Sequence, residues 1–316
     1  MLAELKADTC DVVYISEEEA KFADAMMNLL TMEFDIHTRY ADLLRYNSFR
    51  RARRVREELG HDFVFAVHGN KPCYEFDIFN PKQQAKWRKE HGNTILDFGA
   101  GHLTETNILK AAGFDCTPFE PYHIGVSEID KGKSWEISKK FLEVVASGKE
   151  FTSVFISSVL NSVPFAKDRE HIVCICAALC RPFTKLYACA SSTSETGYRQ
   201  VNGKAFHNES NAGNIAFRLE YESGIRIGDF QDKPKVQKYH TKKEFYDLFY
   251  QFFRDVKISE MSGNVCAKCE NVRRIPWERL VEALQFEFNL PYPDGSRMGL
   301  VEEAITAFKR RYEIFG

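Results

Sequence analysis

The pattern of apolar and polar residues between positions 81 and 190 predicts alternating strands and helices. Apolar runs rich in β-branched and aromatic residues predict strands over 95–98, 114–121, 151–160 and 185–190. Helical spacing fills the intervals, with helices beginning at Pro81, near 104, near 134 and at Asp168, which we expect to cap its helix. This order indicates an α/β fold with a doubly wound parallel sheet, where ligands bind at the carboxyl ends of the strands.

The residues before this alternation predict a different structure. Glu17–Leu30 and His37–Leu59 have apolar residues at helical spacing, so both segments are expected to be helical. Phe63–Val67 and Tyr74–Ile78 resemble two strands joined by the turn-rich linker His68–Pro72, which suggests a small hairpin.

The alternation stops after residue 190. Residues 191–237 are rich in polar residues and predict an insertion with a hairpin, its strands around 217–221 and 225–227, lying over the cofactor edge of the sheet. Thr241 and Glu244 form a capping-box pattern ahead of a helix over 245–253. Val256–Ile258 and Asn264–Lys268 are expected to form a closing antiparallel pair of strands.

The tail predicts two amphipathic helices, Trp277–Phe288 and Met298–Phe315, which either cover the core or form a homodimer. The predicted organisation is a helical extension with a small hairpin over 1–80, a ligand-binding core over 81–270 that contains the insertion 191–237, and a helical tail over 271–316.

Composition limits the class of protein. The chain has 316 residues, of which 44% are hydrophobic, so it is long enough for a sizeable core, and its net charge of −2 creates no overall attraction to nucleic acid or to anionic membranes. Nine scattered cysteines, a polar start at Met1–Lys6 and no apolar run of membrane-spanning length predict a reduced, cytoplasmic protein without membrane contact.

The stretch 95–103, Ile-Leu-Asp-Phe-Gly-Ala-Gly-His-Leu, is the chemically most informative part of the chain. Gly99 and Gly101 let the backbone turn sharply and approach a ligand closely, and the following helix directs its first N–H groups toward that ligand. Glu120 ends the next strand about twenty residues on, where a carboxylate binds a ribose diol. The spacing indicates an adenosine site, although a βα turn without a nucleotide remains an alternative.

A nicotinamide site would require a third glycine in G-x-G-x-x-G, and His102, Leu103 and Thr104 follow Gly101 instead. The pattern D-x-G-x-G followed by a glutamate resembles class I S-adenosylmethionine (SAM) methyltransferases. That resemblance implies a Rossmann-like sheet of the methyltransferase type. It also implies a SAM site in which Asp97 and the glycine backbone line the methionine part and Glu120 binds the ribose hydroxyls. The full set of predicted cofactor-binding residues is Asp97, Gly99, Ala100, Gly101, His102, Glu120, Pro121, Tyr122 and Ser158. Of these, His102 is equally well explained as an exposed loop histidine, and Tyr122 is either a neighbour of the adenine or an aromatic residue of the core.

Further segments follow the glycine loop along the chain in the order Glu120-Pro121-Tyr122, Val159–Pro164 and Val236–Thr241. Together with the glycine loop they are similar to methyltransferases that accompany DNA phosphorothioation systems, over about 90–250. The similarity hints at a nucleic-acid setting without naming the acceptor.

Asn161 and Phe165 are the predicted catalytic residues. Methyltransferases that modify exocyclic amines of bases carry D/N/S-P-P-Y/F/W at the corresponding strand end, and here Asn161-Ser162-Val163-Pro164-Phe165 keeps the polar residue and the aromatic residue but lacks the adjacent prolines. Carbon-5 methylation would need Pro-Cys at this place, whereas Cys174, Cys176 and Cys180 lie within a predicted helix. His123, His207 and His240 are candidate general bases or structural residues.

A dense basic run, Arg45–Arg56, includes Arg50, Arg51, Arg53 and Arg54, which are the predicted nucleic-acid contacts. A solvated helix face is the alternative for this run. DNA or RNA is therefore the preferred acceptor of a SAM-dependent methyl transfer. The alternatives are a small-molecule methyltransferase and a catalytically silent methyltransferase-like binding protein.

Cys266 and Cys269 form a lone CxxC without a second pair of ligands, and zinc requires four, so no metal site is predicted.

Overall fold

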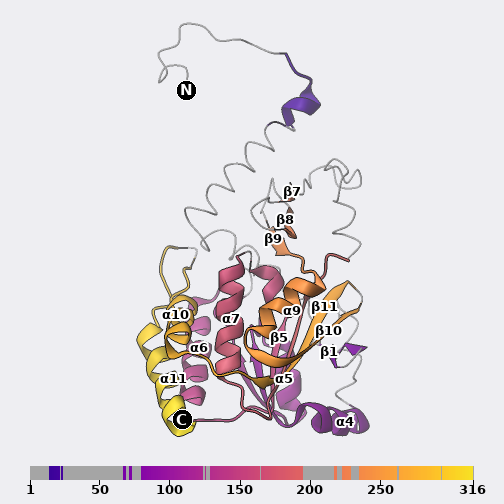
Figure 1. Cartoon of the computed structure of the whole chain (residues 1–316). Helices are drawn as coiled ribbons and strands as arrows, with labels where there is room; N and C mark the ends of the chain where they lie inside the picture. The colour runs from indigo at the N-terminus through magenta and orange to yellow at the C-terminus, as the bar shows by residue number, and fades with distance from the viewer. Residues whose placement is uncertain are drawn as a thin grey trace. The chain divides into compact units, whose positions relative to one another are not determined.

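The computed structural model describes residues 14–21, 23, 67–68, 71–72, 80–123, 125, 129–163, 165–194, 217–218, 223–228, 235–261, 263–292 and 294–315 (Figure 1). The chain divides into two compact units, Met1–Thr38 and Arg39–Gly316. In the first unit, residues 17–21 and 23 are helical, and Ser16 and Glu19 exchange capping hydrogen bonds at the helix start. The rest of the predicted helices over 17–30 and 37–59 lies outside the described residues, as does the run Arg45–Arg56.

The second unit contains a six-stranded sheet of mostly parallel strands. Its members in spatial order are β10 (Phe253–Met261), β11 (Asn264–Val272), β6 (Lys185–Ser191), β5 (Ser153–Ser157), β3 (Thr94–Phe98) and β4 (Asp115–Phe119). Strands β4, β3, β5 and β6 are parallel, whereas β11 is antiparallel to both of its neighbours. This arrangement confirms the predicted doubly wound, Rossmann-like sheet and its closing antiparallel pair.

Helices cover both faces of this sheet (Figure 1). The α4 and α5 helices pack on one face, where Trp87 and Leu109 are buried with Phe155 and Tyr187. The other helices enclose the larger core on the opposite face, and β5 is buried along its whole length because it is covered on both sides. Among the described residues of this unit, the helices are α4 (Pro81–His91), α5 (Thr104–Ala111), α6 (Lys131–Ala146), α7 (Ala166–Ala178), α9 (Lys242–Tyr250), α10 (Trp277–Glu287) and α11 (Val301–Phe315).

Two boundaries near the end of β5 differ from the prediction. The strand ends at Ser157 because Ser158 adopts φ +57°, and a 3₁₀ turn follows over Leu160–Ser162. Helix α7 begins at Ala166 after an extended Phe165, so the prediction that Asp168 caps it was wrong. Asp168 lies in the first turn instead, and its side chain is buried.

Strands β1 (Val67–His68) and β2 (Lys71–Pro72) pair antiparallel, so all of this pair except Val67 lies in the stretch predicted as a linker. The rest of the two predicted strands, 63–66 and 74–78, lies outside the described residues. Strands β7 (Phe217–Arg218), β8 (Ile225–Gly228) and β9 (Lys235–Lys238) form an antiparallel sheet in the insertion, with β9 as a third strand that the sequence pattern did not predict. The predicted capping box at Thr241 and Glu244 is present with both of its hydrogen bonds at the start of α9.

The tail helices cover the core, which was one of the two alternatives for them: Leu280, Leu284, Ala304 and Phe308 are all buried in the larger core. The described part of the chain contains no helix that combines the length and the hydropathy of a membrane span.

Candidate functional site

The glycine loop after β3 packs between the ends of the two neighbouring strands, β4 and β5. The N–H groups of Gly99 and Ala100 both donate to the carbonyl oxygen of Phe119, at 2.8 and 3.0 Å. Gly99 has φ +80°, and a Cβ built on it would lie only 2.3 Å from Cγ2 of Val159. Glycine is therefore required here for backbone conformation and for packing.

Glu120 connects this loop to the end of β4. Its side chain is buried, Oε2 accepts a hydrogen bond from the Gly101 N–H, and Oε1 accepts one from the Tyr122 N–H at 2.8 Å. His123 adds a second link, with Nδ1 2.9 Å from the Gly101 carbonyl oxygen. The carboxylate is thus fixed beside the glycine loop, where the sequence spacing placed it.

Asp97 holds the first turn of α5 against the end of β3. The carboxylate is fully buried, and Oδ2 accepts a hydrogen bond from Thr106 Oγ1 at 2.7 Å. The sequence pattern does not identify Thr106 as a partner of Asp97, because a threonine within a helix carries no signal of its own. Leu103, the N-cap of α5, adopts φ +61° and its apolar side chain cannot cap the helix.

The linker between α10 and α11 packs behind Glu120, an approach that no sequence pattern predicts. The Tyr122 hydroxyl donates to the Pro291 carbonyl oxygen at 2.8 Å, and the Tyr122 and Tyr292 rings meet edge to face with centroids 5.9 Å apart. Burial, and secondly the charge of Glu120, raise the pKa of Tyr292 to about 12. Tyr122 and Pro121 are buried, so Tyr122 presents its backbone N–H to Glu120 from within the core.

The end of β5 lies beside the glycine loop because β5 pairs with β3. Ser158 is exposed in the left-handed region, and its N–H donates to the Cys189 carbonyl oxygen at 2.9 Å. Asn161 lies in the following 3₁₀ turn, and its Oδ1 is buried without a hydrogen-bond partner among the described residues. Phe165, the N-cap of α7, is half-buried a few residues further on.

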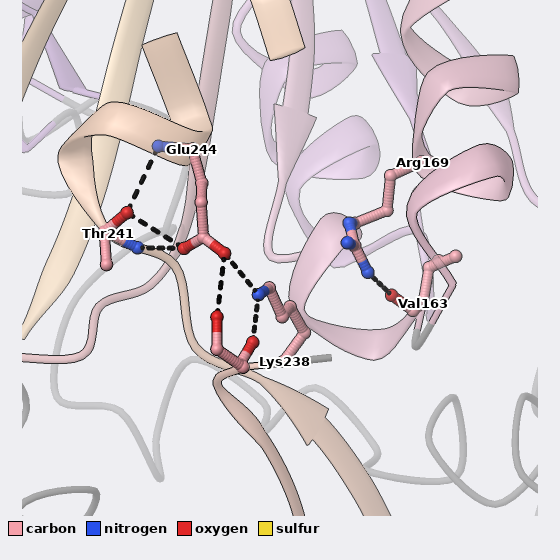
Figure 2. Close-up of polar contacts among 6 residues, drawn as sticks. Val163, Arg169, Lys238, Thr241 and Glu244 are labelled. Atoms are coloured by element: carbon pink, nitrogen blue, oxygen red, sulfur yellow. Dashed lines mark hydrogen bonds and ion pairs between the residues drawn. The ribbon is translucent and has the colours of Figure 1, made fainter. Parts of the chain in front are cut away.

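A polar cluster lies next to this strand end (Figure 2). Arg169 Nη1 donates to the Val163 carbonyl oxygen at 2.8 Å and so holds the segment after the 3₁₀ turn against α7. Lys238, whose side chain is 1% exposed, forms an ion pair with Glu244 at 2.9 Å and donates to the Ser223 carbonyl oxygen. These contacts connect the insertion to the start of α9.

A cavity of about 230 Å³ lies between the first turns of α7 and one side of α9, and Arg169, Lys238, His240 and Glu244 are among the residues that line it. Burial lowers the pKa of His240 well below its ordinary value, and the positive charges of Arg169 and Lys238 lower it further. His240 is therefore a neutral imidazole at physiological pH.

The structure brings the predicted residues together in part. Asp97, Gly99, Gly101 and Glu120 meet at the carboxyl edge of β3 and β4, and Ser158 and Asn161 follow the adjacent strand. His102 is half-buried next to the loop, its ring 6.5 Å from that of His123. The predicted nucleic-acid contacts Arg50, Arg51, Arg53 and Arg54, together with His207, lie outside the described residues.

Cys266 and Cys269 lie on opposite faces of β11. Cys266 is buried with the residues under α4 and α5, whereas Cys269 belongs to the larger core on the other side. Two side chains on opposite faces of a strand do not converge on one ion. Among the described residues there is no group of three or more His, Cys, Asp or Glu side chains placed to hold a metal.

No protein-family model matches the chain, and no curated protein matches it significantly. Among solved structures it is similar to a SAM-dependent methyltransferase from Methanosarcina mazei, at 16% identity over 57% of this chain and 93% of that one, with a TM-score of 0.36. It is also similar to the glycopeptide N-methyltransferase MtfA complexed with SAM (10% identity, 60% and 86% of the chains, TM-score 0.34). Human N-acetylserotonin methyltransferase in complex with SAM is a third such structure (12% identity, 57% and 47%, TM-score 0.33). At these identities and scores, none of them transfers a ligand or a residue role to this chain.

Proposed function

We propose that the chain binds SAM at the edge formed by the glycine loop and Glu120, and transfers the methyl group to an acceptor held beside Asn161. The observation that carries this proposal is the Glu120 carboxylate, buried at the end of β4 and bonded to the Gly101 N–H. A carboxylate fixed at this edge suits the two hydroxyls of a ribose, which donate hydrogen bonds to it.

The neighbouring residues fit the rest of the cofactor. Gly99 and Gly101 have positive φ and lack a Cβ, so a ligand can approach their backbone closely. Asp97, held in place by Thr106, provides a negative charge at the end of β3 for the amino group of the methionine part.

Methyl transfer requires little of the protein beyond the alignment of the methyl donor with the acceptor. When bound, SAM would supply a methyl group on a sulfonium, whose carbon a lone pair of the acceptor attacks in line while the S–CH₃ bond breaks and the sulfur leaves as the neutral thioether of S-adenosylhomocysteine. The chain's own residues then have to orient the acceptor and exclude water. Asn161 Oδ1 is a buried acceptor without a described partner, which is unfavourable, and the N–H of an acceptor amine would satisfy it. Phe165 offers an aromatic surface nearby for a planar acceptor.

For the acceptor we propose nucleic acid. The run Arg45–Arg56 supports this choice, since clustered arginines neutralise phosphates. The exocyclic amine of a base is also a planar N–H donor of the kind that Asn161 and Phe165 would accommodate. The resemblance to methyltransferases of DNA phosphorothioation systems agrees with this setting, and it stays a prediction.

Calorimetric titration of the purified chain with SAM tests the cofactor site. We expect binding with a stoichiometry of one, and loss of binding in Gly101→Arg, whose side chain would fill the loop. Circular dichroism verifies that this variant is folded. No binding to the unaltered chain, or full binding to folded Gly101→Arg, would contradict the proposed site.

Transfer of labelled methyl groups from SAM to fractionated cell extract tests the acceptor class. Label in the nucleic-acid fraction, together with DNA or RNA retention that falls steeply with salt and weakens when Arg50, Arg51, Arg53 and Arg54 become alanine, supports the proposal. Label in the small-molecule fraction instead identifies a metabolite methyltransferase. SAM binding with no labelled product in any fraction identifies a catalytically silent protein.

A further inference from the structure

A second cavity, of about 460 Å³, lies at the other end of the sheet from the glycine loop. It is bordered by the C-terminal end of α7, the end of β11 and the last turns of α11. Helix α7 leads into the start of β6, and β11 runs antiparallel to β6, so both border the amino ends of the parallel strands. The glycine loop follows the carboxyl end of β3. The volume falls within the range of roughly 300–1,000 Å³ that is typical of small-molecule sites.

The lining of this cavity is strongly positive. It contains Arg181, Arg273, Arg274 and Arg311 beside small, apolar and aromatic residues, and none of the described lining residues is acidic. Glu150, outside the lining, pairs with Arg181 at 3.2 Å. Among the described residues, the lining therefore holds four guanidinium groups and no carboxylate, which is a large local excess of positive charge.

Two of these arginines share one aromatic ring. The guanidinium carbons of Arg181 and Arg311 lie 4.2 and 5.0 Å from the centroid of Phe315. Arg311 is buried, and its Nη1 and Nη2 donate to the carbonyl oxygens of Lys149 and Leu179, at 2.6 and 3.1 Å. Burial, and secondly the charge of Arg181, lower the pKa of Arg311 to about 10. The fold therefore holds like charges close together in a site of reduced solvent access, which an anion would stabilise.

We propose that this cavity is a binding site for a small phosphate-bearing molecule, held by the guanidinium groups of Arg181, Arg273 and Arg274 over a floor formed by Arg311. Phosphate oxygens match the planar fork of a guanidinium group, which is why arginine is the common partner of phosphate. The cavity is much larger than a single ion, so it suits a phosphorylated organic compound. The proposal is independent of SAM binding, because it concerns the opposite end of the sheet.

The test is calorimetric titration of the full chain with sodium pyrophosphate and, separately, with ribose 5-phosphate, at an ionic strength held constant with sodium chloride. Arg274→Gln is the informative variant, because Arg274 is exposed and its substitution leaves the packing of the core in place. Arg181→Gln is a second one. We expect each to weaken binding by about tenfold or more, as for the loss of a charge-assisted hydrogen bond.

Arg310→Gln is the matched control, since Arg310 adjoins Arg311 on α11 but is exposed and does not line the cavity. Unchanged binding in this variant, with weakened binding in Arg274→Gln and Arg181→Gln, supports a phosphate site. No binding of either probe, equal weakening by Arg310→Gln, or equally tight binding of citrate would overturn the proposal.

Discussion

The carboxylate of Glu120, at the end of β4, accepts a hydrogen bond from the backbone N–H of Gly101, nineteen positions earlier in the chain. The two halves of the sequence motif are therefore in direct contact, and the same carboxylate also receives the Tyr122 N–H at 2.8 Å. Both donors are backbone groups, so the position of the carboxylate depends on the course of the chain at the ends of β3 and β4.

Glu120→Gln tests this arrangement. An amide keeps the size of the side chain but replaces one acceptor oxygen by an NH₂ group, which cannot accept from a backbone N–H. We expect SAM affinity to fall by about tenfold or more, since hydrogen bonds to a charged group are worth about 1.5–3 kcal/mol. Calorimetric titration measures the affinity, and thermal unfolding without ligand shows the cost of the lost backbone contact.

The matched control for this variant is Glu143→Gln, which removes an exposed carboxylate from α6. It should bind SAM as the unaltered chain does. Equal affinities for Glu120→Gln and Glu143→Gln would rule out a role of Glu120 in holding the cofactor.

Gly99→Ala should destabilise the fold through a direct clash. The new methyl group would meet Val159 Cγ2 at 2.3 Å, in a backbone conformation with φ +80°. We expect a loss of about 2–4 kcal/mol in the free energy of unfolding, combining backbone strain with overpacking. Urea denaturation followed by circular dichroism measures this loss.

Gly295→Ala separates the two contributions, because Gly295 has φ +81° and no heavy atom lies within 4 Å of the position that a Cβ would occupy there. Backbone strain alone acts at Gly295, so we expect a loss of about 1 kcal/mol in the free energy of unfolding. Val159→Ala should recover part of the loss in a Gly99→Ala background. Equal costs at Gly99 and Gly295 would show that the contact with Val159 does not matter.

The sequence predicted the sheet and the glycine loop because both depend on local signals. Apolar runs define β5 and β6, and the spacing of Gly99, Gly101 and Glu120 follows from a strand, a turn and a second strand. The capping box at Thr241 is equally local and was confirmed with both of its hydrogen bonds.

The missed features all depend on tertiary packing. Tyr292 reaches the neighbourhood of Glu120 only because α10 and α11 fold back over the core, and no spacing in the sequence encodes that approach. The start of α7 was misplaced for a related reason. Asp168 resembles an N-cap in sequence, but the chain enters the helix at Phe165 and buries the carboxylate.

Lys238→Met should lower the free energy of unfolding much more than the loss of a surface lysine does. Lys238 is 1% exposed and bonds both Glu244 and the Ser223 carbonyl oxygen, so its loss leaves these acceptors without their cation (Figure 2). We expect a cost of about 2–4 kcal/mol in the free energy of unfolding. Lys243→Met, which breaks an ion pair on a side chain that is 83% exposed, should cost less than about 0.5 kcal/mol. Chemical denaturation of both variants compares them, and similar costs would show that the Lys238 pair does not anchor the insertion.

Asp168 should make stability fall as pH rises. Burial, and secondly the charge of Glu287, raise the pKa of Asp168 to about 8, from an ordinary value of 3.8 in the unfolded chain. Between these values the folded state binds more protons than the unfolded state, so the free energy of unfolding decreases as pH increases from about 4 to about 8. Asp168→Asn removes the ionisation and should stabilise the protein relative to the unaltered chain by about 5 kcal/mol at pH 8.5, against about 1 kcal/mol at pH 4.5.

Urea denaturation at several pH values between 4.5 and 8.5 measures this difference. Glu302→Gln, a change of the same charge at an exposed position of α11, is the control and should show no such trend. The trend arises from the cost of ionising a buried carboxylate, to which the charge of Glu287 adds. A difference between Asp168→Asn and the unaltered chain that stays constant across this pH range would mean that Asp168 is already ionised in the folded protein at pH 5, with its charge stabilised at the start of α7.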